Sequence, residues 1–519
     1  MPYPIASNLK AKGDYSAIVY KEGDLVIAED NEGKVIAKGE AGVDDGSVIQ
    51  AALDSLTPNR TWKEKIILIG DFIASGIKIP SYTIFELQGK ITNPNPSANC
   101  IIEITESNIE LIGGVYDGNR GSTYNTDDSN LNGSGIYTHG ETSDVAPENI
   151  TVRDITVKNT YNRGIVVRNL KKSLFDNVTI ENAGWGGFDL AVASGAPYPS
   201  LCMGNTLRKI TVLNSQVVGI SPGLSTGNEL IACYVDTITK PSEFTGIANG
   251  IGIDSARNLD VVGCTVRNCE DGISIHTSID SNPFQITVKG CKTFSNTRYG
   301  YYLGGARSCK LIGAKSYEDN VGVYVGGGYG NYLDVQLKNN KKQGIYCKDT
   351  RNLTITGRIE DADRDGEGNY AIHLSGVLDC MIIGMHVEEV ETPRTMNGLL
   401  IEDANLTSNR IRIVYSDLQL TATKVTITSA GTDFYFKKVR GYLSENSGTA
   451  TFSGDGSTTQ FSIEHGLVST PSKVQVTPMT EDASGDFYVT ADDTYIYINY
   501  KTAPPSGTDN VKVSWHAEV

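Results

Sequence analysis

The stretch that decides the fold runs from Ile247 to Ser278 and reads IANGIGIDSA, RNLDVVGCTVRN, CEDGISIHTS. It contains one pattern twice: a turn of small or polar residues, then a glycine, Gly250 or Gly272, then apolar residues at alternate positions. Alternation with a period of two is typical of a β-strand with one buried face. Two such strands 22 residues apart indicate a short unit that repeats.

The same unit recurs along most of the chain, at spacings of 22 to 32 residues. Most copies also carry an earlier strand of the type NLDVVGCTVRN or NLTITGRIED. A repeat this short cannot form a sandwich and fits one coil of a β-solenoid, in which each coil buries its apolar residues against the next. We expect about a dozen coils between residue 65 and about residue 430. The shared glycine, replaced once by alanine, stands at 135, 164, 187, 219, 250, 272, 300, 322, 344, 371 and 398.

The two ends of the chain have other patterns. Residues 1–43 read as a small β-rich segment with hairpin turns at 22–24 and 31–33. Asp44-Asp45-Gly46-Ser47 then precedes a helical pattern in which the apolar residues share one face, so a short amphipathic helix with an Asp/Ser cap is expected to cover an open end of the solenoid. Residues 447–519 predict a separate small β-sandwich. The apolar face of the helix is Val48, Ala51, Ala52 and Leu56.

The Asp-Asp-Gly cap, the helix and the aligned coils together resemble the pectate-lyase-like right-handed parallel β-helix superfamily, which includes pectinases, epimerases and bacteriophage tailspikes. The resemblance covers residues 44–430. It implies an all-β fold: a right-handed parallel β-helix with an N-terminal capping helix and a small C-terminal β-sandwich. It also implies a polysaccharide partner, but not one reaction, because a fold of this kind hosts several.

The nearest local likeness is to polygalacturonases, whose successive coils carry Asn-Thr-Asp-Gly, Asp-Asp and Gly-His-Gly. This chain has Ala248-Asn249-Gly250 at the first place and Arg298-Tyr299-Gly300 at the third. Only Glu270 and Asp271 at the second place match, and the resemblance implies that they act as acid and base.

The alignment of the coils also places other acidic residues near Glu270 and Asp271. Alternate residues of each strand face outward, and residues at the same position in adjacent coils form a column with a spacing of ~4.8 Å. Glycosidic cleavage needs two carboxyl groups about 5 to 9.5 Å apart. The acids could instead cap turns or be solvated. If the pair is catalytic, both of its carboxyls must face solvent, because an acid in the apolar bore is unreachable. The candidate catalytic residues are Asp189, Asp254, Glu270, Asp271 and His276, with Asp254 beside His276.

Three tyrosines occupy the same outward position in consecutive coils, beside the small residues Gly304 and Gly326. Aromatic faces suit stacking on sugar rings; the alternative is a ladder buried under a loop or a subunit interface. No cation is obviously beside the acids, so hydrolysis is favoured over β-elimination, and no metal or cofactor is predicted. The candidate substrate-binding residues are Tyr302, Tyr324, Tyr346, Arg298, Tyr299, Lys348 and Arg168.

Composition limits the partners. With 45 basic and 61 acidic residues the net charge is −16, which argues against nucleic acid and against anionic lipid. The sequence has no apolar run long enough for a signal peptide or a membrane span. Nine cysteines, three of them at one place in successive repeats, predict stacked free thiols in the core. These three are Cys233, Cys264 and Cys291.

Two hypotheses follow. The first is a tailspike-like depolymerase that cleaves glycosidic bonds of a bacterial surface glycan or a pectin-like polymer, either on a virion or outside the cell. The second is a non-catalytic glycan-binding adhesin. The C-terminal sandwich is expected to support a homotrimer or to bind sugar through Trp515, Tyr495, Tyr497 and Tyr500. His465 and His516 are expected to be ordinary surface residues.

Overall fold

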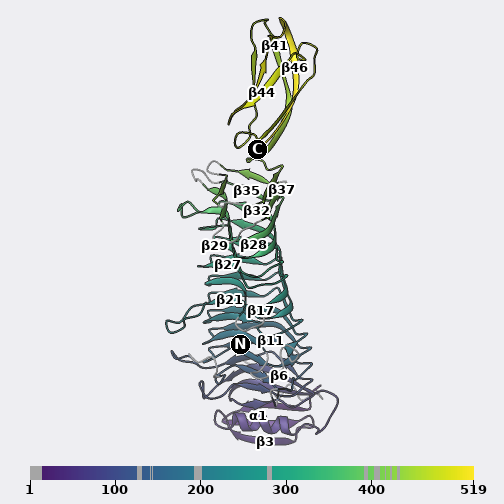
Figure 1. Ribbon diagram of the computed structural model, residues 1–519. Helices are drawn as coiled ribbons and strands as arrows, with labels where there is room; N and C mark the ends of the chain where they lie inside the picture. The colour runs from purple at the N-terminus through teal and green to yellow at the C-terminus, as the bar shows by residue number, and fades with distance from the viewer. Residues whose placement is uncertain are drawn as a thin grey trace.

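The computed structural model describes residues 14–125, 131–140, 142, 144–191, 202–277, 283–390, 396–402, 410–414, 416–420, 424–428 and 433–519. Figure 1 shows an elongated molecule in which short strands stack coil upon coil along one axis, with a helix at one end and a small β unit beyond the other. The predicted fold class is therefore confirmed.

The first sheet carries the shared glycines and is parallel throughout. Among the described residues it has fourteen strands, ordered along the axis as they are along the chain. They are β5 (Ile77–Lys78), β7 (Ile102–Ile104), β10 (Ile136–His139), β12 (Ile165–Arg168), β15 (Gly186–Ala191), β18 (Val218–Ser221), β21 (Asn249–Asp254), β24 (Asp271–His276), β27 (Tyr299–Gly304), β29 (Val321–Gly326), β31 (Ile345–Lys348), β33 (Tyr370–Ser375), β36 (Asn397–Glu402) and β39 (Val425–Ile427).

The second sheet is formed by the other strands of each coil and is also parallel along the solenoid. A two-stranded parallel pair, β13 (Leu170–Lys171) and β16 (Cys202–Met203), lies beside it. The coil strands of the second sheet are β4 (Glu64–Ile73), β6 (Thr83–Thr92), β8 (Glu110–Ile112), β9 (Val115–Asp117), β11 (Thr151–Lys158), β14 (Leu174–Glu181), β17 (Thr206–Leu213), β19 (Glu229–Ile231), β20 (Tyr234–Asp236), β22 (Arg257–Val262), β23 (Thr265–Arg267), β25 (Phe284–Lys289), β26 (Lys292–Phe294), β28 (Lys310–Tyr317), β30 (Tyr332–Lys338), β32 (Arg351–Glu360), β34 (Leu378–Ile383), β35 (His386–Glu388), β37 (Arg410–Val414), β38 (Asp417–Gln419) and β40 (Asp433–Lys437).

The bore between the sheets is filled by one continuous apolar cluster from Ala17 to Val439. The shared glycine is needed where the coils meet: a Cβ on Gly250 would lie 2.1 Å from Val266 Cγ1 and 2.8 Å from the carbonyl oxygen of Gly272. The predicted cysteine stack is confirmed, with the amide of Cys264 donating to Cys291 Sγ at 3.3 Å. All nine cysteines are free thiols.

An antiparallel meander of β1 (Ala17–Glu22), β2 (Leu25–Asp30) and β3 (Val35–Glu40) precedes the solenoid and joins it where β1 pairs with β4. Helix α1 (Asp45–Asp54) packs at this end of the molecule (Figure 1). Its buried apolar face is Val48, Ile49, Ala52 and Leu53, whereas Ala51 is only half-buried.

The prediction that an Asp or Ser side chain caps the N-terminus of α1 is wrong. The helix has no side-chain cap. The carboxylate of Asp45 is fully buried instead, where it accepts the amides of Gly42 at 2.8 Å and Ile73 at 2.7 Å and pairs with Lys21 at 2.8 Å. Asp45 thus ties the turn before the helix to strand β4.

The C-terminal unit has two antiparallel three-stranded sheets: β41 (Glu445–Gly454), β46 (Gly507–Glu518) and β43 (Lys473–Pro478), and β42 (Gln460–Glu464), β45 (Tyr495–Tyr500) and β44 (Phe487–Ala491). Trp515 and Tyr500 are buried in its core. The expectation that these two side chains are available to a sugar is therefore wrong. The expectation of a surface His465 is also wrong, because that ring is fully buried and Nδ1 accepts the amide of Leu467 at 3.0 Å.

Candidate functional site

The outward columns of the first sheet have the register expected from the sequence. Asp254 pairs with His276 on the adjacent coil. Tyr302 pairs with Tyr324, and Tyr324 with Tyr346. The repeat alignment therefore predicts these neighbours correctly.

Asp271 does not face solvent, so the expectation of two exposed carboxyls is wrong for this residue. Its exposed fraction is 0%. The guanidinium of Arg298, from the next coil, covers it: Arg298 Nε donates to Asp271 Oδ1 at 2.7 Å, and a terminal nitrogen of Arg298 bonds the other oxygen. Burial raises the pKa of Asp271 above its usual value, although the hydrogen bonds and charge of Arg298 oppose this shift.

Glu270 has a structural partner on the preceding coil. One carboxylate oxygen accepts the amide of Ala248 at 2.7 Å, and the other lies 3.6 Å from Lys240 Nζ. The side chain is half-buried, so its carboxylate reaches solvent only in part. Lys240 was missed in the sequence, since it lies in a loop outside the aligned strands.

Asp254 and His276 are neighbours at the edge of the same cluster. Ser274 Oγ lies 3.1 Å from His276 Nδ1, and Asp254 accepts the hydroxyl of Ser255 at 2.8 Å. Burial lowers the pKa of His276 below its usual value, against the opposing charges of Asp254 and Asp271. The imidazole is therefore held neutral at physiological pH.

Asp189 belongs to a separate ion cluster, on the N-terminal side of the others. Its Oδ2 lies 2.7 Å from Arg163 Nε and 2.7 Å from a terminal nitrogen of Arg168. Burial raises the pKa of Asp189, but the charges of the two arginines outweigh it and hold the pKa below its usual range. Arg163 could have been found in the sequence, because it directly precedes the shared Gly164. Arg168, a predicted substrate-binding residue, is engaged by this acid.

The aromatic residues form one continuous group on β27, β29, β31 and β33. The rings of Tyr302 and Tyr324 are parallel within 5° with centroids 5.5 Å apart, and Tyr299 stacks on both. Tyr346 meets Tyr324 edge-on and stacks on His373 at 4.5 Å. We call Tyr299, Tyr302, Tyr324, Tyr346 and His373 the aromatic face; each ring is partly exposed.

Two glycines, Gly304 and Gly326, leave room for the rings of Tyr302 and Tyr324. A Cβ on Gly304 would lie 2.6 Å from the hydroxyl oxygen of Tyr302, and a Cβ on Gly326 would lie 2.7 Å from the ring of Tyr324. Glycine at these positions therefore lets each ring lie along its strand. Arg298 joins the two clusters, because its guanidinium lies 4.8 Å from the Tyr299 centroid and 5.2 Å from that of Tyr302 while it pairs with Asp271.

The stacking also corrects one expectation. Neighbouring tyrosines use part of each other's faces, so a ligand meets ring edges and hydroxyls as well as open faces. Burial raises the pKa of Tyr324 to about 12, so its hydroxyl is neutral at physiological pH and can both donate and accept. Lys348 is exposed at the edge of this group, next to Ser375 in register.

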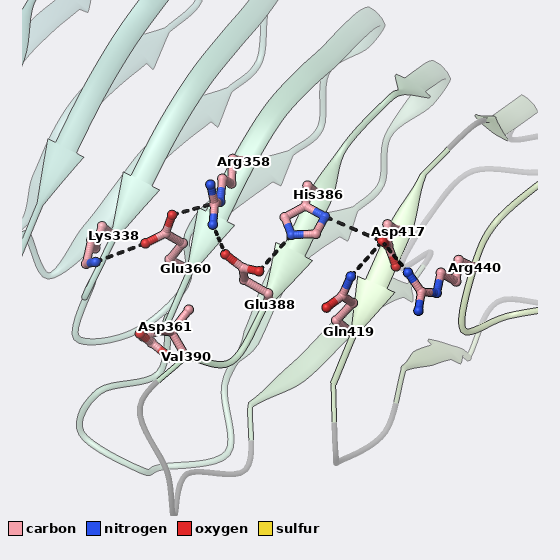
Figure 2. Close-up of polar contacts among 10 residues, drawn as sticks. All are labelled: Lys338, Arg358, Glu360, Asp361, His386, Glu388, Val390, Asp417, Gln419 and Arg440. Carbon is pink, nitrogen blue, oxygen red and sulfur yellow. Dashed lines mark hydrogen bonds and ion pairs between the residues drawn. The ribbon is translucent and has the colours of Figure 1, made fainter.

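A second polar cluster lies on the other sheet, and its charged side chains are paired with one another (Figure 2). Arg358 bonds Glu360 at 2.7 Å and also Glu388, and His386 Nε2 lies 2.8 Å from Glu388. Lys338 lies 3.0 Å from Glu360. Since these members neutralise one another across three coils, this network links the coils rather than presenting a charge to a ligand.

Within the described ranges, no three His, Cys, Asp or Glu side chains converge as a metal site would require. The helix in the described part of the chain is too short and too polar to cross a membrane.

Residues 134–316 match the family model described as "Right handed beta helix region". No curated protein sequence matches the chain. Among solved structures, the tailspike protein gp49 of Pseudomonas phage LKA1 is similar, with 11% identity, coverage of 91% of this chain and 92% of the other, and a TM-score of 0.46.

A tailspike mutant of the E. coli bacteriophage HK620, in complex with hexasaccharide, has 12% identity, 94% and 91% coverage and a TM-score of 0.42. The A-module of mannuronan C-5 epimerase AlgE6 from Azotobacter vinelandii has 13% identity, 77% and 96% coverage and a TM-score of 0.41. The family match spans coils that the structure continues in the same register toward both ends. The described part of the chain therefore has a parallel β-helix fold, and residues 134–316 match the right-handed β-helix family model.

Proposed function

We propose that this protein binds a polysaccharide chain along the aromatic face. The observation that carries the proposal is the run of stacked, partly exposed rings through four consecutive coils. Adjacent coils are ~4.8 Å apart, so the run extends ~14 Å along the axis, which is long enough for several sugar units. Tyrosine supplies an apolar body for sugar C–H groups and a hydroxyl for their oxygens.

The surroundings support the same ligand class. Arg298 at one end and Lys348 at the other add hydrogen-bond donors. Glu402, which bonds His373 at 2.8 Å, adds acceptors for sugar hydroxyls. A run of rings bordered by charged donors and acceptors fits a polyhydroxylated chain better than an apolar peptide or lipid.

The test is direct binding. The full chain is titrated with bacterial capsules, lipopolysaccharides and pectins in affinity electrophoresis. Retardation by at least one polymer is expected. Unchanged mobility with every polymer of the panel contradicts the proposal.

Cleavage of the bound chain is a second candidate, favoured by the position of Asp271 beside the aromatic face. Asp271 would take up a proton and donate it to the glycosidic oxygen as the C–O bond breaks, and Asp254 would take a proton from the attacking water. Arg298 would first have to release Asp271. Glu270, already bonded to Ala248 and near Lys240, would orient this turn.

Reducing-sugar release separates the two functions. If cleavage occurs through this group, Asp271→Asn lowers turnover by about 10² to 10⁴. Binding without any release of reducing ends assigns the protein to the adhesin class. Full activity in the variant would instead direct the search to Asp189 or to a groove between subunits.

Assembly as a homotrimer and a place on a virion or outside the cell are proposals from the sequence. Light scattering of the full chain at micromolar concentration tests the first, and a monomer contradicts it.

A further inference from the structure

The turn that follows the aromatic face carries a second group of stacked side chains: Arg307, Tyr329 and Arg351. Arg307 lies beside Tyr329, and Tyr329 beside Arg351, on successive coils. The guanidinium carbons of the two arginines lie 5.4 and 5.3 Å from the centroid of the Tyr329 ring. Both arginines are exposed, and the ring is half-buried. We call these three residues the arginine corner.

A surface depression of about 370 Å³ adjoins the arginine corner. Gly376 contributes to its wall without a side chain, and a Cβ there would lie 2.6 Å from Asp349 Oδ1. The φ of Gly376 is +60°, a left-handed conformation that favours glycine. The lining residues are Arg307, Gly328, Tyr329, Asp349, Thr350, Arg351, Gly376 and Leu378.

The arginine corner has the chemistry of an oxyanion site. Stacking on Tyr329 uses the flat face of the Arg351 guanidinium and leaves its in-plane N–H groups for a two-pronged contact with a carboxylate or phosphate. Among the described residues, Arg351 forms no ion pair with a carboxylate. The chain as a whole is acidic, at −16, so it does not attract anions in general and a local cation such as Arg351 is needed to hold one.

The corner and the aromatic face lie on the same coils. Strand β31 presents Tyr346 and ends at Lys348, the turn brings Asp349, and β32 begins at Arg351. A ligand on the rings of one coil therefore meets Lys348 and then Arg351 as it passes the edge of the sheet. Asp349 offers an acceptor to hydroxyl groups beside the anion, which suits a charged sugar better than a free inorganic ion.

We propose that the arginine corner binds an oxyanion, a carboxylate or a phosphate, carried by the glycan that occupies the aromatic face. This inference rests on the proposed function and narrows it to anionic polysaccharides. Arg351 makes the contact, and Tyr329 holds its guanidinium in place.

The test uses the full chain and three polymers: polygalacturonate, the same polymer with its carboxyl groups reduced, and poly(glycerol phosphate). Affinities are measured by calorimetry at one salt concentration. Arg351→Gln should weaken binding of the matching anionic polymer about tenfold, the effect of one charge-assisted hydrogen bond, without changing binding of the reduced polymer. Arg351→Lys should recover part of the loss. Arg267→Gln removes an exposed arginine of the second sheet and serves as the control.

The outcomes are distinct. The polymer whose affinity falls in Arg351→Gln identifies the oxyanion as carboxylate or phosphate. Equal loss in Arg267→Gln, or an unchanged preference for the anionic polymer in Arg351→Gln, overturns the inference. If Tyr324→Ala leaves all affinities intact while Arg351→Gln lowers one, the arginine corner stands and the aromatic face fails. Absence of binding to both anionic polymers, in a protein that is retarded by another polysaccharide in affinity electrophoresis, overturns the arginine corner and leaves the proposed function standing.

Discussion

Arg298 Nε lies 2.7 Å from Asp271 Oδ1, one coil away, while the same guanidinium lies over the rings of Tyr299 and Tyr302. The side chain of Arg298 thus covers the buried carboxylate of Asp271 and also borders the aromatic face. This ion pair gives Asp271 a structural role. Asp271 can take part in a reaction only if its ion pair with Arg298 breaks.

Removal of that partner should destabilise the protein. Arg298→Gln leaves a buried carboxyl without its cation, and we expect a loss of about 2 to 4 kcal/mol in the free energy of unfolding at pH 7, measured by denaturant titration. The loss should shrink at low pH, where Asp271 is protonated. Arg298→Gln combined with Asp271→Asn should recover most of it; a double variant as unstable as the single one contradicts the pairing.

Asp319 should make stability depend on pH. Its carboxylate is fully buried and accepts bonds from Thr293 at 2.6 Å, Ser316 at 2.7 Å and Asn296 at 2.8 Å. Burial raises the pKa of Asp319 to about 6. Between about pH 4 and 6 the folded state therefore binds a proton that the unfolded state has lost, so stability falls as the pH rises through this window.

Asp319→Asn removes that titration. We expect the variant to gain up to about 3 kcal/mol of stability at pH 7 and to show a flatter stability profile from pH 4 to 6. The exposed Asp260→Asn is the control. A profile that keeps its slope in Asp319→Asn would show that another group titrates.

The close contact at the shared glycine predicts a cost for any side chain there. Gly250→Ala places a Cβ against Val266 and the carbonyl of Gly272, and we expect a loss of about 1 to 3 kcal/mol from overpacking. A later coil has Ala371 at the equivalent position, so the neighbouring residues decide whether a Cβ is tolerated there. Ala371→Gly should therefore lower the free energy of unfolding by less than Gly250→Ala does. A fully stable Gly250→Ala protein would mean that the coils separate more easily than the packing indicates.

The repeat pattern was sufficient to predict the fold and the columns, because a period of two and a recurring glycine fix which residues face outward and which coils are adjacent. Asp254 and His276 were placed together on that ground, and they are neighbours. The pattern could not predict that Arg298 reaches back over Asp271, or that two arginines enclose Asp189. Those contacts depend on the rotamers of long side chains between coils, which alternation does not encode.

The sequence predicted which strand positions carry the tyrosines, but it did not predict how their rings stack. The three tyrosines stand in register as expected, but their mutual stacking follows from ring sizes and the ~4.8 Å coil spacing rather than from sequence. In the C-terminal unit, Trp515 was expected to be available to sugar and is buried, because short alternating strands do not show which face forms the core.

The most direct measurement is polysaccharide affinity after removal of rings from the aromatic face. Tyr324→Ala together with Tyr302→Ala should weaken binding of the polymer that the wild type retains by about tenfold or more, since one aromatic contact contributes about 0.5 to 1.5 kcal/mol beyond its buried area. Tyr317→Ala, which removes a ring stacked on Phe294 on the second sheet, should leave binding unchanged. Equal affinity in the double variant and the wild type, with folding intact, would contradict glycan binding at the aromatic face.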